Sequence, residues 1–317
     1  MQEDENTVSQ QTSEKTILSV IKKIFSKNDI PFCLFTGVMV LSVIVKLVFK
    51  YAHIKSSSYF VAMCVVQLLL YIVPIFSYMM LKKDCTVKQL RINKFSLSCL
   101  PLILCSAVLM FFTVIMLKYT SVYFLNLSDN SIKEYFFSGT NVYVIIAGVI
   151  IPMICEEALL RGLFLSELKE SAGAVLSVII SSLAFAMIHF SSANFLVYFG
   201  AGIILGVVTY ISGSIIPAIL LHGVNNITAL FTESAVMSYA NENVGGMFAY
   251  VFLLVLFLCS LLAFIYVTER FYLKKALEKE EQNSRIQSEK TFYPKILLSP
   301  VFIIGVLIFI IFTIFPV

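Results

Sequence analysis

Six polar side chains whose chemistry suits hydrolysis lie within three strongly apolar segments of the chain. They are Glu156, Glu157, Arg161, His189, His222 and Asn226. A carboxylate and an imidazole can activate water and transfer protons, and an imidazole with an amide can donate hydrogen bonds to a developing oxyanion. Ionisable residues within membrane spans usually face an interior cavity and mark function, because their exposure to lipid is costly. The sequence therefore predicts a polar site, provided that the three segments meet.

Spacing assigns different tasks to the two neighbouring glutamates. Glu157 and Arg161 are four residues apart, so they share one helix face in the order that favours an ion pair. Glu156 lies about 100° around the same helix and lacks this neighbour. We interpret Glu157 as the partner that neutralises Arg161, which leaves Glu156 available as a general base.

The two histidine segments repeat the four-residue spacing. His189 follows Phe185 by four residues, and Asn226 follows His222 by four. Each pair shares a helix face, so His222 and Asn226 can donate hydrogen bonds into one cavity. Each signal also has a simpler interpretation, in which a histidine bonds a neighbouring carbonyl and an asparagine joins two helices. Their occurrence together with the carboxylate pair favours one common site.

The elements that must position these residues are membrane helices. Hydrophobic residues make up 59% of the 317 residues and charged residues 13%, about half of the charged fraction of a typical soluble domain. The apolar residues form long blocks, and only helices satisfy the backbone of such blocks within lipid. We therefore predict an all-α fold, a polytopic membrane helix bundle of about 8–9 transmembrane helices.

Nine segments have the length and apolarity of a membrane crossing. They are Phe32–Phe49, Tyr59–Met80, Leu97–Leu117, Val142–Leu165, Ala174–Phe190, Phe195–Ile211, Ile215–Phe231, Met247–Val267 and Ile296–Phe315. The fifth to the seventh are short and closely spaced, so a re-entrant or strongly kinked segment is the alternative there.

These segments divide the chain into four parts. The parts are a polar cytoplasmic tail with an amphipathic segment at 1–30, N-terminal transmembrane helices at 31–141, a catalytic core at 142–231, and C-terminal transmembrane helices at 232–317 with a charged cytoplasmic linker at 268–295. The amphipathic stretch Ile17–Asn28 is either an interfacial helix or the start of a long first helix.

Lysine and arginine indicate the orientation in the membrane. Most of them fall in the connections on the side of the N-terminus, whereas the opposite connections hold Lys50, Lys55, Lys118 and Lys133. Cytoplasmic connections are enriched in these residues, so we expect the N-terminus in the cytoplasm. The net charge of +4 then reflects attraction to the lipid bilayer, and nothing supports a nucleic acid as partner.

The depth of the site follows from residue counting. At about 1.5 Å per residue, Glu156 and His222 reach similar depths in the inner half of the membrane. His189 is expected closer to the midplane. We therefore expect a cavity that opens toward the cytoplasm.

Taken together, the three segments resemble the CAAX protease and bacteriocin-processing family, the glutamate-type intramembrane proteases. The family motifs EExxxR, FxxxH and HxxxN occur in this order, as EEALLR from Glu156, FAMIH from Phe185 and HGVNN from His222. Gly162 and the flanks of the third motif match as well, while Leu160 stands where an aromatic residue is common. The resemblance extends over residues 142–231.

The resemblance implies peptide-bond hydrolysis by an integral membrane protein. Glu156 would activate the water, and His189 would hold it or shuttle its proton. His222 and Asn226 would stabilise the oxyanion, while Glu157 and Arg161 would hold the shape of the site. The third motif is similar to that of the bacterial branch, which implies a bacterial cell membrane and a membrane-associated peptide or protein as substrate.

A metal ion is an open alternative. Glu156, His189 and His222 would make a three-ligand zinc set with an open position for water. No HExxH motif is present, and the resemblance implies that glutamate acts directly. The metal-free mechanism, without a cofactor, is the favoured expectation.

Two other classes of function use similar residues. Buried Glu, His and Arg also form proton relays in secondary transporters, although no internal repeat of the kind typical there is evident. The other class is a relative without catalysis, such as a bacteriocin immunity or scaffold protein. Retention of every motif position favours the protease.

Overall fold

The structure is a computed structural model that describes residues 30–51, 56–81, 90–127, 142–241, 246–280 and 299–314. Within these ranges the chain is helical and contains no strand, which confirms the predicted all-α class. The predicted tail up to residue 29 and the part of the predicted linker after Glu280 lie outside the described residues.

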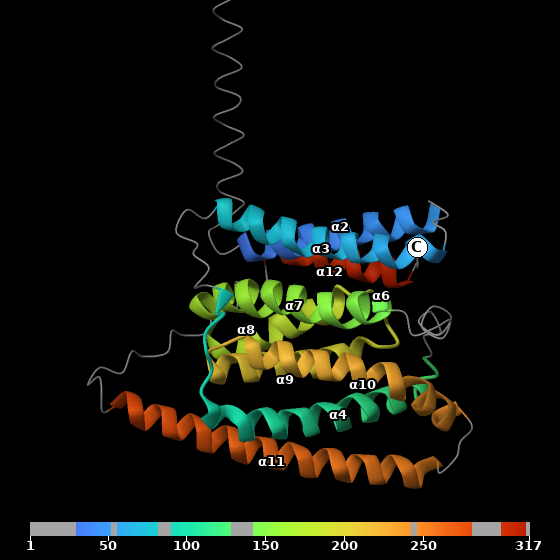
Figure 1. Cartoon of the computed structure of the whole chain (residues 1–317). Coiled ribbons are helices and arrows are strands. Elements are labelled where there is room, and N and C mark those ends of the chain that lie inside the picture. Colours follow the sequence, from blue (N-terminus) through green and yellow to red (C-terminus); the bar gives the residue numbers. More distant parts are fainter. Residues whose placement is uncertain are drawn as a thin grey trace, which may run out of the picture.

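The helices are arranged in layers (Figure 1). One outer layer contains α2 (Ile30–Tyr51), α3 (Ser56–Leu81) and α12 (Pro300–Ile314). The opposite one contains α4 (Leu100–Tyr123), which follows the short η3 (Leu97–Cys99), and α11 (Gly246–Glu280). Between them lie α6 (Val142–Ile145), η4 (Ile146–Ile150), α7 (Ile151–Glu157), η5 (Ala158–Phe164), α8 (Leu165–Met187), α9 (Phe195–Ser212) and α10 (Ile216–Asn241). All three predicted motifs therefore belong to the middle layers.

The helices fit a membrane protein. Among the described residues, five are long and apolar enough to cross a bilayer: Pro31–Tyr51, Val61–Met80, Leu97–Tyr123, Phe195–Ser212 and Gly246–Leu273. Shorter apolar helices occupy Ala172–Met187, Ile216–Leu230 and Pro300–Ile314. With the broken helix that begins at Val142, these account for each predicted span. Three helices continue well past their expected ends. α4 runs past Leu117 and includes Lys118, while α10 and α11 run past Phe231 and Val267.

The helix that contains the two glutamates is widened by π-helical turns on both sides of them. At the end of η4 the amide of Ile151 donates a hydrogen bond to the carbonyl of Ile146. At the end of η5 the amide of Leu165 donates to the carbonyl of Leu160. Such i to i+5 turns are rare and occur frequently at functional sites. The hydrophobic pattern of the sequence did not reveal them.

A glycine separates this helix from the next predicted span. Gly173 has φ 75° and ψ 178° inside α8, a conformation that only glycine adopts without strain. The chain therefore changes direction between the EExxxR motif and the segment that ends at His189, where the sequence predicted a boundary.

Small residues bring α8 and α9 close together. A methyl group placed on Gly202 would lie 3.0 Å from Cβ of Ser182, and one on Gly206 would lie 3.0 Å from Cγ1 of Val178. Glycines four residues apart allow helix backbones to approach within a membrane. This approach brings the carbonyl of Gly202 within reach of the EExxxR helix.

Candidate active site

Arg161 is held on three sides in the interior of the bundle. Its Nη1 donates to Oε1 of Glu157 at 2.8 Å, and both side chains are fully buried, so the predicted ion pair is present. Nη2 donates to the carbonyl of Gly202 at 3.1 Å, and the guanidinium lies 4.6 Å from the centre of the Phe185 ring. Arg161 thus ties the EExxxR helix to α8 and α9.

Glu157 also orients His222. Nδ1 of His222 lies 2.9 Å from the same oxygen, Oε1 of Glu157. A carboxylate beside an arginine can only accept hydrogen bonds, so Nδ1 of His222 carries the proton. In a neutral His222 ring, Nε2 is then an acceptor that faces Glu156.

The spacing of the FxxxH motif is explained by a backbone hydrogen bond. Nδ1 of His189 donates to the carbonyl of Phe185 at 2.7 Å, because a carbonyl can only accept. The imidazole stacks on Tyr198, with centroids 3.9 Å apart and planes at 20°. The Phe185 ring meets both imidazoles edge-on, at 4.9 Å from His189 and 5.6 Å from His222. Phe185 therefore positions both histidines and Arg161.

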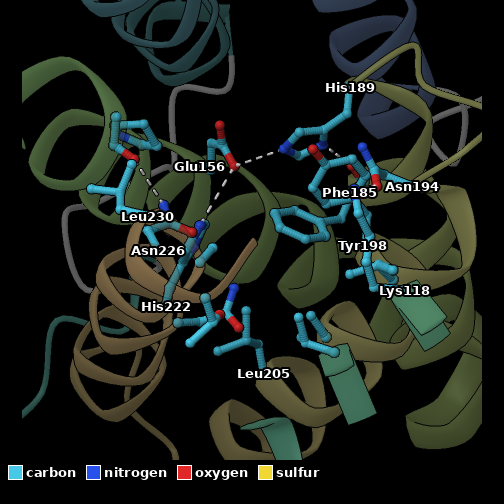
Figure 2. A pocket seen from close by; sticks show the side chains of 18 of the residues that line it. Lys118, Glu156, Phe185, His189, Asn194, Tyr198, Leu205, His222, Asn226 and Leu230 are labelled. Carbon is cyan, nitrogen blue, oxygen red and sulfur yellow. Dashed lines mark hydrogen bonds and ion pairs between the residues drawn. The ribbon is translucent and has the colours of Figure 1, made fainter. Parts of the chain in front are cut away.

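Glu156 lies where the histidines converge (Figure 2). Its Oε1 accepts a hydrogen bond of 3.0 Å from the hydroxyl of Tyr71 on α3. Its Oε2 lies 3.8 Å from Nε2 of His189 and 4.0 Å from Nε2 of His222. Among the described residues this buried oxygen has no hydrogen-bond partner. If both imidazoles are neutral, Oε2 of Glu156 and the two Nε2 atoms are all hydrogen-bond acceptors. A molecule that donates hydrogen bonds would therefore fit between them.

Glu156, His189 and His222 have the chemistry of a zinc site but not its spacing. The chemistry fits, because each histidine directs Nε2 to the gap and donates Nδ1–H to a carbonyl or carboxylate, as metal-bound histidines do. The spacing is wide, because tetrahedral bonds of about 2.0–2.1 Å hold ligand atoms about 3.4 Å apart. The distances from Glu156 Oε2 to the two Nε2 atoms, 3.8 and 4.0 Å, exceed this value. Within the described ranges, no group of three or more His, Cys, Asp or Glu side chains is arranged to hold a metal ion.

Asn226 faces the same region from α10. Its Nδ2 donates to the carbonyl of Gly148 at 3.2 Å. In an α-helix that carbonyl would accept from the amide of residue 152, but Pro152 has no amide hydrogen. The proline therefore leaves room for the side chain of Asn226, which keeps a second N–H for other partners.

A cavity of about 340 Å³ joins these residues. Glu156, His189, His222 and Asn226 all line it, together with residues of α3, α4, η4 and α9. Glu157 and Arg161 are not part of its wall and lie behind Glu156 and Phe185. The structure thus brings the six predicted residues together, four at the cavity and two in support.

The lining residues show toward which end of the bundle the cavity extends. Its other residues on α10 follow His222, and those on α7 and η4 precede Glu156. It therefore extends toward the end of the bundle where α6 begins, opposite the end where α11 ends (Figure 1). On the opposite side of Glu156, large buried residues of η5, among them Leu160 and Phe164, fill the interior. The expectation of a cytoplasmic opening relied on depth along single helices and stays a prediction.

Two residues of the site were not predicted from the sequence. Tyr71 carries no charge and lies 85 residues before Glu156, so neither charge nor spacing pointed to it. Lys118 was expected in a connection, yet it is buried at the cavity, where its Nζ donates to Oδ1 of Asn194 at 2.6 Å. In the sequence, the signal for Lys118 is a lysine directly after a long apolar segment. Because the span was predicted to end at Leu117, Lys118 was assigned to the connection instead of the helix.

Comparison with known proteins supports the assignment made from the motifs. Residues 138–228 match the family model described as Type II CAAX prenyl endopeptidase Rce1-like. No curated protein and no solved structure matches the chain. The matched residues include all three motifs and the four site residues that line the cavity. Residues 138–228 are therefore similar to this family of CAAX endopeptidases, in agreement with the resemblance that the three motifs carry.

Proposed function

We propose that the protein is an intramembrane endopeptidase in which Glu156 activates a water molecule against a peptide bond of a membrane-associated substrate. One observation carries this proposal: Oε2 of Glu156 is buried, lacks a hydrogen-bond partner among the described residues, and faces Nε2 of both histidines at the cavity wall. A water oxygen at about 2.8 Å from each atom fits between acceptors separated by 3.8 and 4.0 Å.

The proposed reaction begins with this water. Its two hydrogens point to Oε2 of Glu156 and Nε2 of His189, which leaves a lone pair for the scissile carbonyl carbon. On attack, the proton passes to Glu156, and the carbonyl oxygen becomes an oxyanion. Glu156 then delivers the proton to the amide nitrogen as the C–N bond breaks, which releases an amine and a carboxylic acid.

The oxyanion is assigned to His222 and Asn226. Nδ1 of His222 already donates to Glu157, so Nε2 donates to the oxyanion only when the ring is an imidazolium. The second N–H of Asn226 completes the pair of donors.

The direct test compares peptides from cells that express the wild-type protein or Glu156→Gln. Fragments that require the intact carboxylate support the endopeptidase, and their sequences identify the substrate. Glu269→Gln is the matched control, because Glu269 is exposed on α11. Identical peptide profiles in all three strains, with equal amounts of folded protein, would reject the peptidase in favour of a non-catalytic or transport function.

A further inference from the structure

A glutamine of α3 has a buried side-chain oxygen at the wall of the cavity. Oε1 of Gln67 has no hydrogen-bond partner among the described residues, and the side chain lines the cavity together with Glu156. A buried amide oxygen without a partner is unfavourable, and such groups in folded proteins are rare. Of the buried unpartnered atoms in the described part of the chain, only Oε1 of Gln67 and Oε2 of Glu156 belong to residues of the cavity wall. Both atoms therefore indicate molecules that bind from the cavity.

Gln67 is placed one helical turn from the residue that holds the proposed base. It precedes Tyr71 by four residues, so the two side chains share one face of α3. Tyr71 donates to Oε1 of Glu156 at 3.0 Å, and α3 packs against α7. Met63, one further turn away, lines the cavity as well. This face of α3 thus follows the cavity from the neighbourhood of Glu156 outward.

A peptide inside this cavity needs hydrogen-bond partners from the protein. Most residues of the wall are apolar, so they offer nothing to the peptide N–H and C=O groups. An amide that leaves water without gaining a new partner is strongly disfavoured. In an extended chain the N–H and C=O of one residue point to the same side. The side-chain amide of Gln67 matches this pair, because its oxygen accepts and its nitrogen donates.

We propose that Gln67 binds the backbone of the peptide substrate near the site of cleavage. Oε1 accepts a hydrogen bond from a peptide N–H, and Nε2 donates to the carbonyl of the same residue. The inference rests on the endopeptidase function and specifies how the substrate is held. Proline or an N-methylated residue is disfavoured at this position of the substrate, because neither has an N–H.

The test measures how much the peptide N–H groups contribute to binding. Glu156→Gln protein, purified in detergent, is immobilised and offered two pools of apolar dodecamers of randomised sequence with acetyl and dimethylamide caps. One pool has ordinary amide bonds. The other is built from the matching α-hydroxy acids, so esters replace the amides and no backbone N–H remains. The readout is the ratio of the amide pool to the ester pool among the retained molecules.

Variants in the Glu156→Gln background relate this ratio to Gln67. Gln67→Met keeps the length of the side chain and removes both hydrogen-bonding groups, so the ratio should fall about fivefold, the effect of one hydrogen bond. Gln67→Leu is a second apolar variant and should behave in the same way. Gln67→Glu keeps an acceptor oxygen and should retain the ratio. Val65→Met is the matched control, because Val65 is 51% exposed on α3 and does not line the cavity.

The outcomes separate this inference from the endopeptidase. Equal retention of both pools, or a ratio unchanged in folded Gln67→Met and Gln67→Leu, overturns the backbone contact and leaves a bound water as the partner of Oε1. A ratio lowered in both apolar variants and retained in Gln67→Glu supports the contact, whereas a ratio lowered in all three overturns the acceptor role. If the ratio depends on Gln67 but protein with intact Glu156 releases no fragments from the amide pool, the endopeptidase proposal fails and the peptide contact remains.

Discussion

The hydroxyl of Tyr71 donates to Oε1 of Glu156 across 85 positions of sequence, at 3.0 Å. Because one carboxylate oxygen is fixed in this way, the other is directed at the two imidazoles. A residue of α3, outside the segment that matches the family, thus orients the proposed base.

Tyr71→Phe retains the ring and removes this hydrogen bond. Hydrogen bonds to charged groups contribute about 1.5–3 kcal/mol, so we expect kcat to fall by one to two orders of magnitude with KM little changed. Steady-state kinetics on a peptide identified as substrate measure both constants. Tyr272→Phe is the control, since Tyr272 is 56% exposed and should change neither constant. An unaltered kcat in Tyr71→Phe would show that Glu156 needs no such support.

The two glutamates should differ sharply when each is replaced. Glu157→Ala leaves Arg161 buried without its carboxylate and releases His222, so the free energy of unfolding should drop by about 3–5 kcal/mol. Glu156→Gln should abolish turnover yet unfold at a temperature close to that of the wild type. Thermal unfolding in detergent compares them, with the exposed Glu269→Ala as reference. Wild-type stability of Glu157→Ala would contradict the assigned ion pair.

Gly202 is expected to tolerate no side chain. A Cβ there would lie 3.0 Å from Cβ and 3.1 Å from Cα of Ser182, so α8 and α9 must separate. Overpacking of this kind costs about 1–3 kcal/mol, and the carbonyl that accepts from Arg161 would shift with it. The matched control is Gly37→Ala in α2, where a Cβ meets nothing within 4 Å. We expect lower stability and activity for Gly202→Ala only; equal stability of the two variants would argue against the close approach.

The side from which water and substrate reach the cavity is testable by cysteine labelling. In a background without the native cysteines, Ala229→Cys at the cavity wall should react with an impermeant thiol reagent supplied from the exterior. Ala218→Cys, at a position with no exposure, should stay unlabelled. Arg270→Cys reports the cytoplasmic side independently. Labelling of Ala229→Cys from the cytoplasm alone would restore the opening that the sequence predicted.

Metal dependence distinguishes a water molecule activated by Glu156 from a zinc ion bound by Glu156, His189 and His222. Because the gap at Glu156 suits a water better than a zinc ion, we expect proteolysis to persist after dialysis against EDTA and 1,10-phenanthroline. Metal analysis of the active protein provides the second measurement. Activity that disappears on chelation and returns with stoichiometric zinc would assign Glu156, His189 and His222 as ligands.

What the sequence predicted correctly depended on local spacing. The pairing of Glu157 with Arg161 follows from helix geometry, and the FxxxH spacing corresponds to the bond between His189 and the carbonyl of Phe185. The bond between His222 and Glu157 joins residues 65 positions apart, so it depends on how the helices pack. Tyr71 is neutral and lies 85 positions from Glu156, so neither charge nor spacing identifies it. The direction of the cavity depends on residues of α3, α4, α7, α8, α9 and α10 and could not be derived from depth along one helix.

The wall of the cavity is assembled from two parts of the chain. The residues assigned to bond cleavage lie within 138–228, whereas Met63 and Gln67 on α3, and Val114, Ile115 and Lys118 on α4, lie before it. Chemistry and choice of substrate can therefore change independently. A chimaera that keeps residues 138–228 and takes these two helices from another protein that matches the same family model should retain the proposed reaction and acquire the donor's selectivity.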